Sequence, residues 1–85
     1  GPGDAMKVAV LLFARYREAA GVPSLEVEVI EPATIGVVWE AVRERVPALR
    51  AETRPMLACN RAHARPETVV RRGDEIAVFP PVSGG

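Results

Sequence analysis

Two short segments rich in strand-forming residues, one near each end of the chain, constrain the fold most strongly. Residues 7–13 (KVAVLLF) are apolar on both faces, and residues 75–79 (EIAVF) form the last such segment. A chain of 85 residues can bury only one small core. We therefore expect these two segments to lie side by side in the middle of one sheet.

The segments between them each have one apolar face. Residues 25–29 (LEVEV) alternate strictly between aliphatic and glutamate side chains, which predicts a half-buried strand. Thr34 is a candidate N-cap, and after it apolar side chains recur at helical spacing as far as Pro47, which predicts one amphipathic helix. The apolar stripe of this helix consists of Ile35, Val38, Trp39, Val42 and Val46.

Shorter elements complete the pattern. Residues 14–20 (ARYREAA) predict a short helix that ends at Gly21, and residues 56–59 (MLAC) predict a short strand. Asn60-Arg61 and residues 71–74 (RRGD) are typical of turns. This order predicts an α+β fold of the ubiquitin-like β-grasp type, with a mixed β-sheet, one main helix packed across it and an extended C-terminal tail.

We expect a single domain. Residues 1–5 (GPGDA) ahead of Met6 resemble a cloning remnant, so the folded domain should span residues 6–79 and a flexible tail residues 80–85. Apolar residues make up 48% of the chain and charged residues 26%, as in globular domains. The formal net charge of +0 argues against a nucleic-acid or membrane partner. A single cysteine and the absence of a secretory signal lead us to expect a cytoplasmic protein.

Alternation along the central strands divides their side chains between two faces. The larger aliphatic side chains should face the main helix, and a second face should carry Phe13 and Phe79. That second face is either partly covered by loops or exposed as an apolar patch that docks a partner. Because Phe79 lies close to the tail, the docking interpretation is favoured. The residues of this face are Ala9, Leu11, Phe13, Ala77 and Phe79.

The tail PPVSGG carries the most chemical information. Pro80 and Pro81 stiffen its base, and Gly84 and Gly85 have no side chains that would block entry into a narrow active site. A free carboxylate is a poor electrophile and must first be activated, most simply as an acyl-adenylate. Attack by sulfide would then give a thiocarboxylate, a good sulfur nucleophile. The alternative is a terminus that is merely frayed.

Other reactive side chains give weaker signals. His63 is the only histidine, so the chain alone cannot build a Ser/His pair or a multi-histidine metal site, and we expect no metal. Cys59 ends an apolar strand and is interpreted as a buried, inert thiol rather than a nucleophile. Arg15 and Arg17 are either solvated helix charges or partner contacts.

Three stretches of the sequence resemble the MoaD family, the small sulfur-carrier subunits of molybdopterin synthase. They are VLLFARYREAAG at residues 10–21, RRGDEIAVFPP at residues 71–81, and the terminal PPVSGG. The resemblance covers the sequence from Met6 to Gly85. It implies a β-grasp fold and a chain that is not catalytic by itself.

The resemblance also implies a reaction cycle. A MoeB-like enzyme would use ATP to adenylate Gly85, and a sulfur donor would convert the adenylate to a thiocarboxylate. Residues 80–84 (Pro80, Pro81, Val82, Ser83 and Gly84) would then insert into a MoaE-like large subunit, in a heterotetramer of two small and two large subunits. There sulfur would pass to cyclic pyranopterin monophosphate in molybdenum cofactor biosynthesis. The chain itself would bind no cofactor.

The same resemblance assigns a docking patch of Phe13, Phe79, His63 and Leu11, although His63 stands where the family often has an apolar residue. Val37 replaces a common acidic residue early in the main helix, and Asn60-Arg61 replaces an Asn-Gly-like turn. Three alternatives stay open: a sulfur carrier for thiamin synthesis or tRNA thiolation, a ubiquitin-like protein modifier, and an interaction module whose Gly-Gly ending is incidental.

Overall fold

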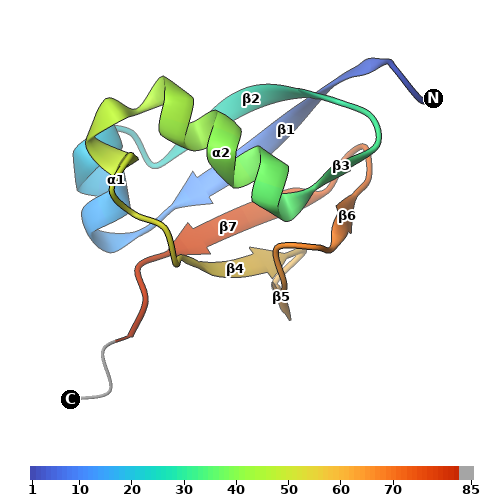
Figure 1. The fold of residues 1–85 in the computed structure, drawn as a ribbon. Helices are drawn as coiled ribbons and strands as arrows, with labels where there is room; N and C mark the ends of the chain where they lie inside the picture. Colours follow the sequence, from blue (N-terminus) through green and yellow to red (C-terminus); the bar gives the residue numbers. More distant parts are fainter. Residues whose placement is uncertain (83–85) are drawn as a thin grey trace.

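The computed structural model describes residues 1–82, in which one sheet is crossed by one main helix (Figure 1). The five-stranded sheet has the order β2-β1-β7-β4-β5. Its strands are β1 (Ala5–Leu12), β2 (Ser24–Ile30), β4 (Met56–Cys59), β5 (Ala62–Ala64) and β7 (Glu75–Phe79). The helices are α1 (Ala14–Ala20) and α2 (Ile35–Arg45), with a short 3-10 helix at Pro47–Leu49. A separate pair of two-residue strands, β3 (Ala33–Thr34) and β6 (Val69–Val70), lies beside the sheet.

The two apolar segments from the ends of the chain form the centre of the sheet, as predicted. β1 pairs with β7 in parallel, with Val10 opposite Ile76. β2 and β4 flank this pair in antiparallel orientation. The mixed sheet with one crossing helix confirms the predicted β-grasp fold.

The core lies between the sheet and α2. The inward-facing side chains of β1 and β7 are buried against the apolar stripe of the helix, as their alternation predicts. Each fully buried aliphatic side chain of this kind contributes about 1.5–3 kcal/mol relative to exposure. The buried residues of this interface include Val8, Val10, Leu12, Ile76, Val78, Ile35, Val38 and Val42.

The main helix begins and ends near the predicted residues. The Thr34 hydroxyl accepts a hydrogen bond from the Val37 N–H at 3.3 Å, which confirms the N-cap. Gly36 lies close to Pro66, and a Cβ added at this glycine would lie only 3.3 Å from the Pro66 carbonyl oxygen. Glycine therefore lets the helix backbone approach Pro66 closely, despite its weak helix propensity. α2 ends at Arg45, and Val46, predicted as part of the stripe, is buried just beyond it with a φ of −123°.

The structure differs from the sequence-based expectation at several boundaries. β1 begins at Ala5, one residue before the expected domain, because Ala5 pairs with Ile30 through the backbone ladder. β1 ends at Leu12, so Phe13 lies just after the strand. The 3-10 helix and the β3–β6 pair were not predicted, since elements of two or three residues show no periodicity.

The predicted turn at Asn60-Arg61 is a two-residue hairpin connection between β4 and β5. Both residues have positive φ angles, 51° and 70°, as a type I′ turn requires. The Asn60 side chain also links this turn to the next one, since its Nδ2 donates to Asp74 Oδ1 and its Oδ1 accepts from the Glu75 N–H, both at 2.9 Å. These hydrogen bonds therefore fix the β4–β5 turn beside the start of β7.

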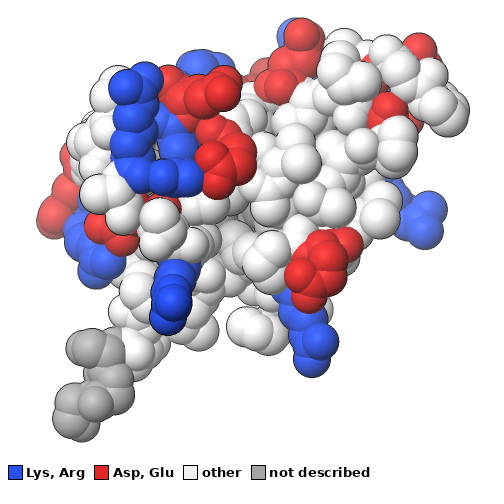
Figure 2. Space-filling model, viewed as in Figure 1, with Lys and Arg blue, Asp and Glu red and all other residues white. Residues whose placement is uncertain are grey.

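Acidic and basic side chains are interspersed over the face that carries α2 (Figure 2). This mixing agrees with the formal net charge of +0. In the part of the chain that is described, neither helix is long and apolar enough to cross a membrane.

Candidate functional site

The sheet face opposite α2 is the candidate docking surface. The single buried residue of α1, Tyr16, packs against Trp39 of α2 with ring centroids 5.2 Å apart, so α1 lies on the same side of the sheet as α2. On the other face the side chains of residues 1–82 are half-buried or exposed. The strand register places one row of them side by side, consisting of Leu11, Ala77, Ala58 and His63.

Two aromatic rings form the centre of the candidate surface. Phe79 is the last residue of β7 and Phe13 follows β1, so the parallel pairing of these strands brings both to the same edge. Their rings stack with centroids 4.5 Å apart and planes inclined by 10°. Phe13 is 38% exposed. The structure thus confirms that the two aromatic residues share one open face.

The backbone explains why Phe13 stays on that face. Phe13 keeps extended angles (φ −129°, ψ 155°) and so continues the alternation of β1 with Leu11. The chain turns only at Ala14, whose φ of 51° lies in the left-handed region. For a residue other than glycine this conformation costs about 1–2 kcal/mol. The strain lies directly beside the exposed aromatic pair.

Met56 completes the surface and was not predicted. It lies opposite Phe79 in the register of β4 and β7 and is 38% exposed. Because the segment MLAC is apolar throughout, alternation alone does not show which side chain faces outwards; the burial of Leu57 settles it. The residues around these side chains enclose a hollow of about 380 Å³, which we call the apolar hollow. It is lined by Phe13, Ala14, Met56, Phe79, Pro80 and Val82.

The predicted tail begins directly at this hollow. Pro80 and Pro81 follow β7, and neither can donate to a strand ladder, so pairing ends there. Pro80 and Val82 line the hollow, and Val82 is 80% exposed. Figure 1 shows the chain leaving the body beyond the end of β7. The predicted site residues Ser83, Gly84 and Gly85 lie outside the described residues.

The two other predicted docking residues lie on the same face as the aromatic pair, in the next row of the sheet. Leu11 is half-buried in the neighbouring row, and His63 is exposed on the edge strand β5. Ala58 and Ala77 separate His63 from Leu11 in that row. A docking role for His63 stays a prediction, and it would concern the far edge of the surface rather than the apolar hollow.

Glu52 connects both helices to the loop that leads into Met56. Arg15 donates two hydrogen bonds to the Glu52 carboxylate, at 3.1 and 2.8 Å, and the Tyr16 hydroxyl donates a third at 3.2 Å. Trp39 Nε1 donates to the Glu52 carbonyl, also at 3.2 Å. Arg15 is therefore an ion-pair partner within this chain. The contacts hold the loop that positions Met56 at the apolar hollow.

These contacts shift two pKa values in opposite directions. The hydrogen bonds from Arg15 lower the pKa of Glu52. Burial, together with the adjacent Glu52 carboxylate, raises the pKa of Tyr16 to about 12. Since the unfolded chain would ionise its tyrosine near pH 10, the stability from this effect is complete below pH 10 and is lost as the pH rises towards 12.

This shift predicts a measurable alkaline transition. Tyr16 is the only tyrosine, so ultraviolet titration of the folded protein should report a phenol pKa near 12 without overlap. The free energy of unfolding, measured in urea, should fall by roughly 2 kcal/mol between pH 10 and 12 more than in Tyr16→Phe. Tyr16→Phe isolates this group because Cys59, whose pKa is also raised, remains in both proteins. A phenol that titrates near pH 10 would contradict the burial argument.

Cys59 is half-buried and lies away from the apolar hollow. Burial raises the pKa of its thiol, and the Asp74 carboxylate adds to the effect. The thiol is therefore protonated at neutral pH, although the side chain is half-buried rather than buried as expected. Across residues 1–82, no three His, Cys, Asp or Glu side chains gather in a way that could hold a metal ion.

Comparison with known proteins identifies relatives over most of the chain. The model of the ThiS family matches residues 10–85. The molybdopterin synthase sulfur carrier subunit of Arabidopsis thaliana is 35% identical over 84 residues, which cover 96% of this chain and 86% of the relative. That of Haemophilus influenzae is 42% identical and covers 89% and 96%. The crystal structure of small archaeal modifier protein 1 from H. volcanii has a TM-score of 0.84 at 29% identity, covering 91% and 99%.

Proposed function

Because this chain belongs to the ThiS family, alongside the molybdopterin synthase sulfur carrier subunits, we propose that it carries sulfur for molybdenum cofactor biosynthesis as a thiocarboxylate on Gly85. The observation that carries the proposal is the continuity between the apolar hollow and the tail. Pro80 and Val82 line the hollow, and the sequence after them ends in Gly84-Gly85. A partner that binds the hollow therefore receives the tail at a fixed point.

The proposed chemistry takes place on the terminal carboxylate and uses partner active sites. A carboxylate oxygen of Gly85 attacks the α-phosphate of ATP in a MoeB-like enzyme, and pyrophosphate leaves. Sulfide from a donor attacks the acyl carbon, AMP leaves, and the thiocarboxylate remains. Its sulfur then attacks a carbon of cyclic pyranopterin monophosphate and displaces an oxygen substituent. Water hydrolyses the resulting thioester, so that the sulfur stays on the pterin and the Gly85 carboxylate is restored. Positioning and charge stabilisation come from the partners, so the chain itself is not catalytic and binds no cofactor.

The large subunit is the proposed occupant of the apolar hollow. Threading the tail orders its backbone at about 1–2 kcal/mol per residue. Contact with the stacked aromatic pair and Met56 offsets this cost, since buried aromatic anchors dominate protein interfaces. We place a MoaE-like subunit here, in a heterotetramer of two small and two large subunits. We also propose that the chain acts in the cytoplasm, as its sequence leads us to expect.

A second candidate function is protein modification. It is favoured by the TM-score of 0.84 to small archaeal modifier protein 1. A modifier would use the same Gly85 adenylate, but a lysine amine of the target would attack it and leave an isopeptide bond. A carrier would form the thiocarboxylate and leave no conjugates.

Intact-mass spectrometry tests the proposal and separates the two functions. After incubation with a MoeB-like enzyme, ATP and sulfide, the mass should change by the replacement of one oxygen with sulfur, mapped to Gly85. Omission of ATP should leave the mass unchanged. Lysine conjugates in place of this product would favour the modifier. An unmodified chain, with the enzyme active on another carrier, would reject both.

A further inference from the structure

The free edge of β2 is exposed in the sheet and plays no part in the proposed sulfur transfer. β2 is the first strand in the order β2-β1-β7-β4-β5, so only one of its sides is paired. In an antiparallel pair, alternate residues bond to the neighbour and the others point outwards. The Leu12 N–H donates to the Pro23 carbonyl and the Glu31 N–H to the Asp4 carbonyl, so the odd-numbered residues of this segment face β1.

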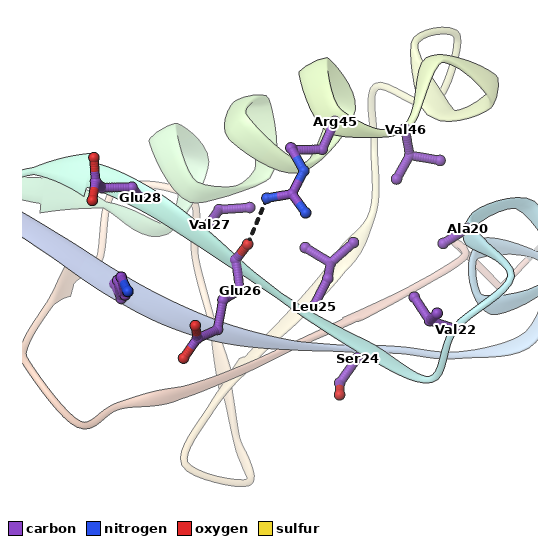
Figure 3. A pocket seen from close by; sticks show the side chains of 10 residues that line it. Ala20, Val22, Ser24, Leu25, Glu26, Val27, Glu28, Arg45 and Val46 are labelled. Atoms are coloured by element: carbon purple, nitrogen blue, oxygen red, sulfur yellow. Dashed lines mark hydrogen bonds between the residues drawn. The ribbon is translucent and has the colours of Figure 1, made fainter.

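The even-numbered residues of β2 therefore direct their N–H and C=O groups to the free edge. These residues are Ser24, Glu26, Glu28 and Ile30. One contact agrees with this assignment: Arg45 Nη1, at the end of α2, donates to the Glu26 carbonyl at 2.9 Å. Figure 3 shows Arg45 reaching from the helix to this carbonyl. Such a row of backbone groups is a template for another strand.

A groove with both apolar and charged walls runs along this edge. A cavity of about 640 Å³ lies between β2, the end of α2 and the loop after α1. Its apolar part is formed by Val22, Leu25 and Val46, and Val22 is 41% exposed (Figure 3). Its charged part is formed by Lys7, Glu26, Glu28 and Arg45. The apolar hollow has none of these residues in its lining, so both surfaces can be occupied together.

The opposite face of the same edge is acidic. The side chains of Glu26 and Glu28 are exposed, because alternation turns them away from the buried Val27. Within the described residues neither makes an ion pair, and their cross-strand neighbours on β1 are Ala9 and Lys7. A second β2 strand would bring like charges together, which is destabilising. A strand with basic residues opposite these glutamates would be attracted.

We propose that the free edge of β2 binds an extended segment of a partner protein in which basic and apolar residues alternate. The basic side chains lie opposite Glu26 and Glu28, and the apolar side chains fill the groove over Val22 and Leu25. Backbone groups of β2 pair with the segment, as in other cases of strand addition. Arg45 competes with the segment for one backbone acceptor. Its guanidinium donates a hydrogen bond to the Glu26 carbonyl, and this bond must break before the strand pairs.

A model peptide tests this surface directly. The probe is a capped heptapeptide alternating lysine and valine, titrated into the ¹⁵N-labelled full chain. Amide shifts should be confined to residues 22–28 and 45–46, and the amides of Glu26 and Glu28 should gain protection from hydrogen exchange. A matched peptide of glutamate and valine should bind about tenfold more weakly, given the cost of like charges across strands. A proline at the central position of the lysine peptide should also weaken binding, since it removes a ladder donor.

Charge-reversal variants of the chain test the same contact from the side of the protein. Glu26→Lys combined with Glu28→Lys should reverse the preference between the two peptides, and circular dichroism should show an unchanged fold because both side chains are exposed. Arg45→Gln should strengthen binding of the lysine peptide. Absence of binding, shifts centred on Phe13 and Phe79, or an unchanged preference in the double variant would each overturn the proposal. So would a concentration-dependent dimer that shifts the same β2 amides without peptide.

Discussion

Gly85→Ala should reduce thiocarboxylate formation about a hundredfold or more while leaving the fold unchanged. The methyl group would displace the reacting carbonyl carbon inside the adenylating site, where a misplacement of about 1 Å costs roughly 10²-fold in rate. It would also remove the backbone freedom that glycine provides for threading. Because Gly85 lies beyond β7 in sequence, the urea midpoint should match that of the wild type. The measurement is intact-mass spectrometry after timed incubation with the adenylating enzyme, ATP and sulfide.

Two controls define what this result means. Ser83→Ala changes a tail residue without adding bulk beside the carboxylate, and it should retain most of the activity. An alanine added after Gly85 moves the carboxylate to a new residue and should abolish the product. If Gly85→Ala reacts at the wild-type rate, the steric argument for the terminal glycines fails. If all three proteins bind the large subunit equally well, the loss lies in chemistry and not in docking.

The fold could be predicted from the sequence where periodicity is strong. Residues 7–13 and 75–79 were expected at the centre of the sheet, and the structure pairs them in parallel. The stripe beginning at Ile35 predicted α2 because its spacing and the cap at Thr34 agree. The pair β3 and β6 could not be predicted, since two-residue strands arise from tertiary pairing and not from a local pattern.

The candidate site could be predicted only in part, for the same reason. Alternation placed Phe13 and Phe79 on one face, and the structure stacks them. It could not place Met56, whose strand has apolar residues on both sides. Nor could it show that Glu52 joins both helices, because partners separated by 37 residues in sequence leave no local signal. The terminal residues were assigned by their chemistry, and their part in the reaction stays a prediction.

Phe79→Ala should weaken binding of a MoaE-like large subunit about 30-fold. Large aromatic residues at the centre of an interface typically account for 2 kcal/mol or more when truncated, which corresponds to this factor. Phe79 lies between Phe13 and Met56 in the apolar hollow, so its removal would open the middle of the contact. The dissociation constant can be measured by calorimetry with the purified large subunit. The fold should persist because the core on the other face of the sheet is untouched.

A double-mutant cycle distinguishes a docking role from a loss of local packing. The Phe13 and Phe79 rings have centroids 4.5 Å apart, so Phe13→Ala and Phe79→Ala should be non-additive in binding. Val37→Ala is the matched control: this side chain is 49% exposed on α2, far from the hollow, and its loss should leave the affinity unchanged. Phe79→Leu keeps much of the apolar area and should recover part of the binding. Wild-type affinity in Phe79→Ala would remove the apolar hollow as the docking surface and leave the tail as the sole contact.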